Sequence, residues 1–142
     1  MKAKILSAGV VVVKRYDEGF KYLLLRAFNH WDFPKGVVEK GEDAFDGALR
    51  EVREESTIED LVFHWGHSYK ETGPYGQGKV ARYYLAETQQ DNVELPINPA
   101  IGMPEHEEFL WLNYEEALQI VSPRVRSVLE WSKDILKYDS PE

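Results

Sequence analysis

The segment 44–56, AFDGALREVREES, constrains the fold most, because its apolar residues recur with the period of an α-helix. At about 100° per residue, four apolar side chains share one stripe at spacing i, i+3, i+4 and i+7; they are Phe45, Ala48, Leu49 and Val52. Asp43, directly before the segment, is a suitable N-cap. The segment is therefore expected to form a helix whose apolar stripe faces the core.

The rest of the chain mostly predicts β-strands. Apolar, β-branched residues predict a hairpin of two strands, 4–14 and 20–27, around the turn 16–19. Further strands are expected at 61–71, 79–87 and 108–113, helices at 113–121 and 122–138, a turn at 72–78 and a long loop at 88–106. Strands mixed with helices in this way predict an α/β fold, a sandwich around a mixed β-sheet, in a single domain 1–142.

The composition limits the class of protein. The 142 residues include no cysteine, which excludes disulfides and thiolate metal sites and fits a cytoplasmic location. The formal net charge of −8 argues against a stable long nucleic-acid footprint, which needs a basic face, but permits a nucleotide held locally through a cation. No apolar run approaches the roughly 20 residues that cross a membrane, so no membrane partner is expected. The oligomeric state does not follow from the sequence.

The helix at 44–56 also carries an unusual arrangement of acids. Glu51, Glu54 and Glu55 fall in an arc of roughly 100° on one flank of the apolar stripe, and the arginines fall on the other flank. Gly47 lies one turn before Glu51 in the same arc, and we interpret it as open space beside the carboxylates. Converging carboxylates suit a hard divalent cation such as Mg²⁺, which would offset their repulsion. The alternative is a solvated acidic face of a helix.

The spacing of these residues resembles a known signature. Gly36, five residues, Glu42, seven residues and then REVREESTI at 50–58 resemble the Nudix box, G-x5-E-x7-R-E-U-x-E-E-x-G-U, in which U is a bulky apolar residue. Eight of its nine fixed positions match over 23 residues. Thr57 stands where the family has glycine, at a helix end that often needs a positive φ. We therefore expect the exit turn of the helix to be reshaped.

The resemblance implies an α/β/α sandwich and a role for each box residue. The metal ligands would be Glu51, Glu54, Glu55 and the main-chain carbonyl of Gly36, with Mg²⁺ as the cofactor and Mn²⁺ as a substitute. Arg50 and Glu42 would pair to hold the helix and its loop in register. Glu105, in the long loop, matches a glutamate that approaches the catalytic water in related enzymes. The general base is expected to be Glu105 or Glu54.

The substrate-binding residues also come from the resemblance. Lys35 would contact a phosphate, and Tyr75 lies near the offset associated with dinucleoside polyphosphate substrates. Tyr83 is a lesser candidate for stacking on a base, with packing in the core as its favoured role. His106 matches a histidine of the dinucleoside polyphosphate subfamily. Pro74 lies near the offset associated with ADP-ribose enzymes, but turn chemistry alone explains a proline there.

Four functions are compatible with these features. The segments HWDFPKG, YYLAE and PEHEEFLWLNYEEA look like the subfamily that cleaves dinucleoside polyphosphates asymmetrically, so hydrolysis of diadenosine tetraphosphate to ATP and AMP is the leading hypothesis. The segments PEHEEFLW and VSPRVRSVLEW also look like bacterial RNA 5′-pyrophosphohydrolases, which act on an RNA 5′ end. Hydrolysis of ADP-ribose or another nucleoside diphosphate derivative comes next. A catalytically silent nucleotide sensor is the last, although all box carboxylates are kept.

Overall fold

The central strand of the fold is β1 (Ile5–Tyr16), in a computed structural model that describes residues 5–139. It pairs in parallel with β6 (Lys79–Glu87) and antiparallel with β2 (Gly19–Ala27) and β4 (Lys35–Val37). The predicted first hairpin is confirmed, although Lys4, the expected first residue of its first strand, lies outside the described residues. The mixed sheet is completed by β3 (His30–Asp32), β5 (Lys70–Tyr75) and β9 (Glu108–Leu112).

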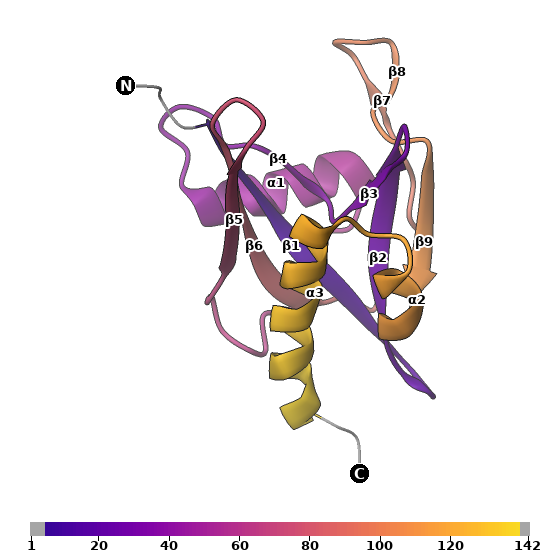
Figure 1. Cartoon of the computed structure of the whole chain (residues 1–142). Coiled ribbons are helices and arrows are strands. Elements are labelled where there is room, and N and C mark those ends of the chain that lie inside the picture. Colours follow the sequence, from indigo (N-terminus) through magenta and orange to yellow (C-terminus); the bar gives the residue numbers. More distant parts are fainter. Residues whose placement is uncertain (1–4, 140–142) are drawn as a thin grey trace.

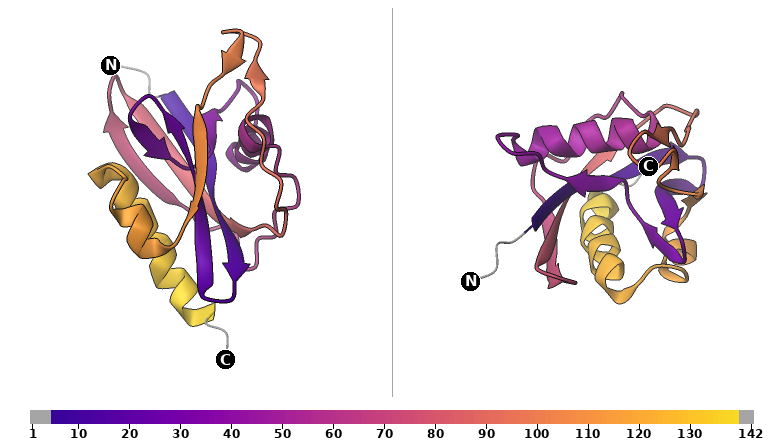
Figure 2. Two further views of the ribbon diagram at one scale, coloured as in Figure 1. Left: turned by 90° about the vertical axis from the view of Figure 1, so that its right-hand side faces the viewer. Right: turned by 90° about the horizontal axis from the view of Figure 1, so that it is seen from above.

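Helices cover both faces of this sheet (Figures 1 and 2). Side chains of β1 alternate, so Val10 and Val12 pack with α1 (Ala44–Ser56), whereas Val11 and Val13 pack with α3 (Pro123–Leu136). The short helix α2 (Tyr114–Leu118) lies on the same side as α3, which ends in the 3-10 turn η1 (Lys137–Asp139). The predicted α/β/α sandwich is therefore confirmed. Within residues 5–139, no helix combines the length and the apolarity needed to cross a membrane.

Helix α1 starts and ends much as its sequence suggests. The Asp43 carboxylate accepts hydrogen bonds from the N–H groups of Phe45 and Asp46. At the other end, Thr57 adopts the left-handed conformation with φ 65°, and its N–H donates to the carbonyl of Arg53. The expectation that Thr57 would reshape this turn is wrong. A segment distant in sequence holds the residue in place, because the side chain of Gln90, shortly after β6 (Lys79–Glu87), donates to the Thr57 carbonyl at 3.0 Å.

Several segments differ from the sequence-based expectation, among them the turn expected at 72–78, of which residues 72–75 belong to β5. The strand expected at 61–71 begins only at Lys70, because Gly66 has φ +88°, typical of a turn, and Val62 makes an isolated bridge with Glu87. The loop expected at 88–106 contains a short hairpin of β7 (Ile97–Asn98) and β8 (Met103–Pro104). Strands of two residues are too short for a periodic pattern to reveal them.

Candidate active site

Strand β4 brings Gly36 against the acidic side of α1. A Cβ atom on Gly36 would lie 2.0 Å from both Cδ and Oε1 of Glu51. Any side chain at this position would therefore displace the Glu51 carboxylate. Glycine here is explained by close approach, and its strand pairing with Ala8 of β1 fixes the distance between strand and helix.

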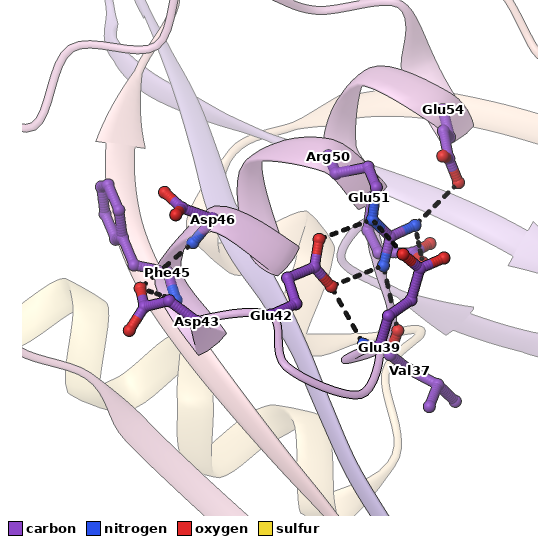
Figure 3. A network of polar contacts seen from close by, with 9 residues as sticks. All are labelled: Val37, Glu39, Glu42, Asp43, Phe45, Asp46, Arg50, Glu51 and Glu54. Atoms are coloured by element: carbon purple, nitrogen blue, oxygen red, sulfur yellow. Dashed lines mark hydrogen bonds and ion pairs between the residues drawn. The ribbon is translucent and has the colours of Figure 1, made fainter.

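Arg50 lies at the centre of a charged network on α1 (Figure 3). Its guanidinium donates to both oxygens of Glu42, with Nε–Oε2 at 2.8 Å and Nη2–Oε1 at 3.1 Å. Its Nη1 also donates to Glu51 Oε2 at 2.8 Å and to Glu54 Oε1 at 3.0 Å. The interpretation that the acids are segregated from the arginines is therefore wrong for Arg50, because the long side chain reaches across the helix surface to both acids.

The same network corrects the interpretation of Gly47. A Cβ atom there would lie 2.9 Å from Oε1 of Glu42 and 3.5 Å from a methyl group of Val38. The glycine therefore makes room for the Glu42 carboxylate rather than leaving open space beside the other acids. Glu42 also accepts from the N–H of Glu39 at 2.9 Å. The hydrogen bonds from Arg50, and then that from the main chain, lower the pKa of Glu42 to about 2.

Glu55 is the buried acid of the site, with 9% of its surface exposed. Its Oε1 accepts from the main-chain N–H of Lys35 at 3.0 Å, which ties α1 to β4. Burial, followed by the nearby charges of Glu105 and Glu51, raises the pKa of Glu55 to about 9. This pKa favours the protonated form of Glu55 at neutral pH in the absence of a cation.

Three residues at this point offer ligand atoms to a common centre. Atoms of Glu55, Glu105 and His106 all lie within 4.8 Å of one another. Burial lowers the pKa of His106, so its imidazole is neutral at pH 7 and its 4.0 Å contact with Glu55 is not an ion pair. Burial also raises the pKa of Glu51, against the opposing effect of Arg50. This mainly carboxylate donor set, built around a glycine that a Cβ would fill, fits a hard divalent cation.

A cavity of about 500 Å³ opens over these acids. One wall is polar and includes Glu51, Glu54, Glu55, Glu105 and His106. The lining also includes Arg53 and a mostly apolar set of residues from the segment 95–104, which we call the apolar wall; they are Leu95, Pro96, Ile97, Asn98, Pro99 and Pro104. A volume of this size suits a small organic ligand, and the two walls suit one with a charged part and an apolar part.

The predicted stacking residues do not line this cavity. Tyr83 is fully buried on the α3 side of the sheet, and its hydroxyl donates to Asp32 at 2.9 Å. The favoured role in the core is therefore confirmed, and the lesser candidacy of Tyr83 for base stacking is wrong. Tyr75 is partly buried, and its ring lies 4.3 Å from the guanidinium carbon of Arg124. Lys35 sits between the two regions, because its main-chain N–H holds Glu55 while its Nζ lies 3.9 Å from Asp32.

Three residues of this region escaped the sequence reasoning. Arg124 forms a 2.6 Å ion pair with Asp32, which directly precedes the segment that carries Lys35. Asn98 donates from Nδ2 to Oε1 of Glu105 at 3.3 Å. The position of Asp32 in HWDFPKG, three residues before Lys35, was a usable signal for one of them. No local pattern marks Arg124 or Asn98.

Comparison with known proteins finds relatives that match most of this chain. The family model described as NUDIX domain matches residues 5–132. The bis(5′-nucleosyl)-tetraphosphatase (asymmetrical) of Caenorhabditis elegans is 34% identical over 125 residues, covering 82% of this chain and 84% of that protein. An RNA pyrophosphohydrolase of Azorhizobium caulinodans is 28% identical over 122 residues, covering 73% of this chain and 71% of that protein.

A solved structure gives the same result. The crystal structure of a C. elegans Ap4A hydrolase binary complex superposes with a TM-score of 0.78 at 29% identity, covering 94% of this chain and 98% of that one. The family match therefore includes the segment from Gly36 to Ile58, which resembles the Nudix box, and extends over nearly the whole described chain. The chain belongs to the Nudix family of hydrolases.

Proposed function

We propose that this protein hydrolyses dinucleoside polyphosphates asymmetrically, with diadenosine tetraphosphate cleaved to ATP and AMP. The observation that carries the proposal is the cavity that joins a carboxylate wall to an apolar wall. A polyphosphate chain with a cation suits the first wall, and a nucleoside suits the second. The identity to the C. elegans tetraphosphatase over most of both chains supports the same substrate class.

Mg²⁺, with Mn²⁺ as a substitute, is the proposed cofactor. The residues that would hold it are Glu51, Glu54, Glu55 and the carbonyl of Gly36. When bound, the ion neutralises charge on the phosphate chain and makes a water molecule more acidic. The chain prepares for this by burying Glu55 between its helix and β4, and by placing Glu51 against a position that has no side chain.

The proposed reaction is attack by water on a phosphorus atom of an anhydride bridge. The new P–O bond forms as the bridging P–O bond breaks, and the leaving phosphate departs with the bridging oxygen. The proton of the water passes to a carboxylate, for which we propose Glu105, with Glu54 as the alternative. Glu105 faces the cavity from a segment outside the helix, close to Glu55 and His106. Lys35 would contact a phosphate, and His106 would contact another part of the substrate from the lining of the cavity. Tyr75 lies outside this lining, so it would contact a part of the substrate that extends beyond the cavity.

The second candidate is an RNA 5′-pyrophosphohydrolase. It is favoured by the match to the A. caulinodans enzyme, and only the 5′ end of the RNA would have to enter the cavity. The formal net charge of −8 disfavours further contacts along an RNA chain. Cytoplasmic location remains a prediction for either function.

Product analysis tests the proposal. Purified protein with Mg²⁺ would be incubated separately with diadenosine tetraphosphate, 5′-triphosphorylated RNA and ADP-ribose, and the products resolved by anion-exchange chromatography. ATP plus AMP, formed far more efficiently than the other products, is expected. The variant Glu54→Gln should lose turnover with the fold retained, and unchanged turnover would refute the metal assignment. Preferential release of pyrophosphate or phosphate from RNA would move the function to RNA processing.

A further inference from the structure

The hairpin β7–β8 is a built element that stands apart from the main sheet. Its strands pair with each other, Ile97 with Pro104 and Asn98 with Met103, and with no other strand of residues 5–139. Figure 1 shows it extending beyond the end of the sheet. The turn is closed around Asn98, whose carbonyl accepts from Gly102 N–H at 2.8 Å and whose Oδ1 accepts from Ala100 N–H at 2.9 Å. The hairpin is therefore an ordered arm rather than a loose connection.

The arm exposes large apolar side chains. Ile97 is 66% exposed, Ile101 53% and Met103 59%. Exposed apolar residues grouped on one short element next to a cavity mark a contact surface for a ligand or partner. Of the three, Ile97 lines the cavity over the acids, whereas Ile101 and Met103 do not.

The position of the arm identifies its ligand. The carboxylates of the cavity suit a cation and a phosphate chain, and in the proposed substrate a nucleoside is covalently joined to that chain and would reach the apolar wall. Leu95, Pro96 and Ile97 offer it apolar surface, as do Pro99 and Pro104. A nucleobase has the flat, largely apolar faces that such a wall covers. Tyr83 cannot do this, because it is fully buried on the other face of the sheet.

We propose that the β7–β8 hairpin is a substrate-binding arm that covers one nucleobase of the dinucleoside polyphosphate, with Ile97 as the contact residue. This inference rests on the proposed function for the class of ligand. Asn98 connects the arm to the chemistry, because its Oδ1 closes the turn while its Nδ2 donates to Glu105. Binding of the base along the arm and the position of Glu105 are therefore coupled through one side chain.

The test compares two isoleucines of the same hairpin. Ile97→Ser removes an apolar side chain that lines the cavity. Ile101→Ser makes the same substitution at an exposed position of the hairpin that does not line the cavity. Affinities would be measured by calorimetry with Mg²⁺ for a methylene-bridged, non-hydrolysable diadenosine tetraphosphate and for inorganic tetraphosphate. We expect Ile97→Ser to lower the affinity for the dinucleotide analogue roughly tenfold, which is the scale of one lost apolar contact. The affinity for inorganic tetraphosphate should stay unchanged. Ile101→Ser should change neither.

Each other result would overturn the inference. It fails if Ile97→Ser binds the dinucleotide as the unsubstituted protein does, if both ligands weaken equally, or if Ile101→Ser behaves like Ile97→Ser. Absence of binding of the dinucleotide to the unsubstituted protein would also overturn it. Because binding is measured without turnover, failure of the proposed function is seen separately, as a protein that binds the analogue through Ile97 but releases no ATP and AMP from diadenosine tetraphosphate.

Discussion

Replacement of Gly36 by alanine separates the function of the site from the stability of the fold. The new Cβ would lie 2.0 Å from the Glu51 carboxyl group, but that group is the end of a flexible side chain and can swing away. Gly36 does not lie in the left-handed region of φ, so alanine brings no backbone strain. Displacing Glu51 breaks its 2.8 Å hydrogen bond from Arg50, a net loss of about 1–2 kcal/mol for a charged pair.

The expected change in stability is small because two effects oppose each other. Alanine reduces the conformational entropy of the unfolded chain, which returns about 0.4–1 kcal/mol. The free energy of unfolding should therefore fall by about 1.6 kcal/mol at most, a shift in Tm of no more than roughly 5 °C. Activity should fall more, by roughly 10- to 100-fold, because a proposed metal ligand has left its place.

Gly9→Ala is the matched control, since Gly9 pairs with Lys35 beside the same contact. Its Cβ would lie 2.2 Å from the main-chain carbonyl oxygen of Pro34, which cannot move without the strand. This variant should lose about 3 kcal/mol of stability. Urea unfolding without metal would give the free energy of unfolding of each variant. Turnover of diadenosine tetraphosphate over a Mg²⁺ titration would give its activity. The reasoning is refuted if Gly36→Ala keeps full activity, or if its loss of stability equals that of Gly9→Ala.

Three further predictions concern other parts of the site. Because the pKa of Glu55 is about 9 in the metal-free fold and about 4.5 when unfolded, the folded state binds more protons between these values, so stability without metal should fall as pH rises from 4.5 to 9. Thermal unfolding in chelator should show this fall, and Glu55→Gln should remove it. Arg124→Met leaves Asp32 without its 2.6 Å partner and should cost about 2–3 kcal/mol in urea unfolding, with Asp32→Asn recovering part of the loss in the double variant. Asn98→Asp keeps the acceptor for the turn but faces Glu105 with a like charge. The kcat of this variant should therefore fall severalfold, equivalent to roughly 1 kcal/mol, while its melting temperature stays unchanged. Equal kcat in the variant and the unsubstituted protein would contradict the link between Asn98 and Glu105.

Local patterns predicted the fold well, because the signals are periodic and contiguous. The helix over 44–56 is found with the same bounds, and the alternation along β1 fills the cores on both faces of the sheet. The prediction failed where a single backbone angle decided the outcome, as at Gly66, which interrupts the strand-like sequence 61–71. Thr57 shows the converse, since tertiary hydrogen bonds hold a left-handed angle that its residue type disfavours.

The site was only partly predictable, for a different reason. Spacing on a helix shows which residues share a flank, and it correctly grouped Glu51, Glu54 and Glu55 beside one cavity. It does not show where a long side chain ends, so the contacts of Arg50 with two of these acids were missed. Contacts between residues far apart in sequence, such as Asp32 with Arg124, have no local signature at all.

The network around Arg50 has a consequence for handling the protein without metal. Its guanidinium serves as counter-ion for Glu42, Glu51 and Glu54, so the chain itself compensates much of the crowded negative charge. A divalent ion held by Glu51 and Glu54 would take over charge compensation that Arg50 already gives to these acids. A chelator should therefore abolish turnover while leaving the circular dichroism spectrum intact, and readdition of Mg²⁺ should restore activity without refolding. The metal is therefore expected to be necessary for turnover but not for folding.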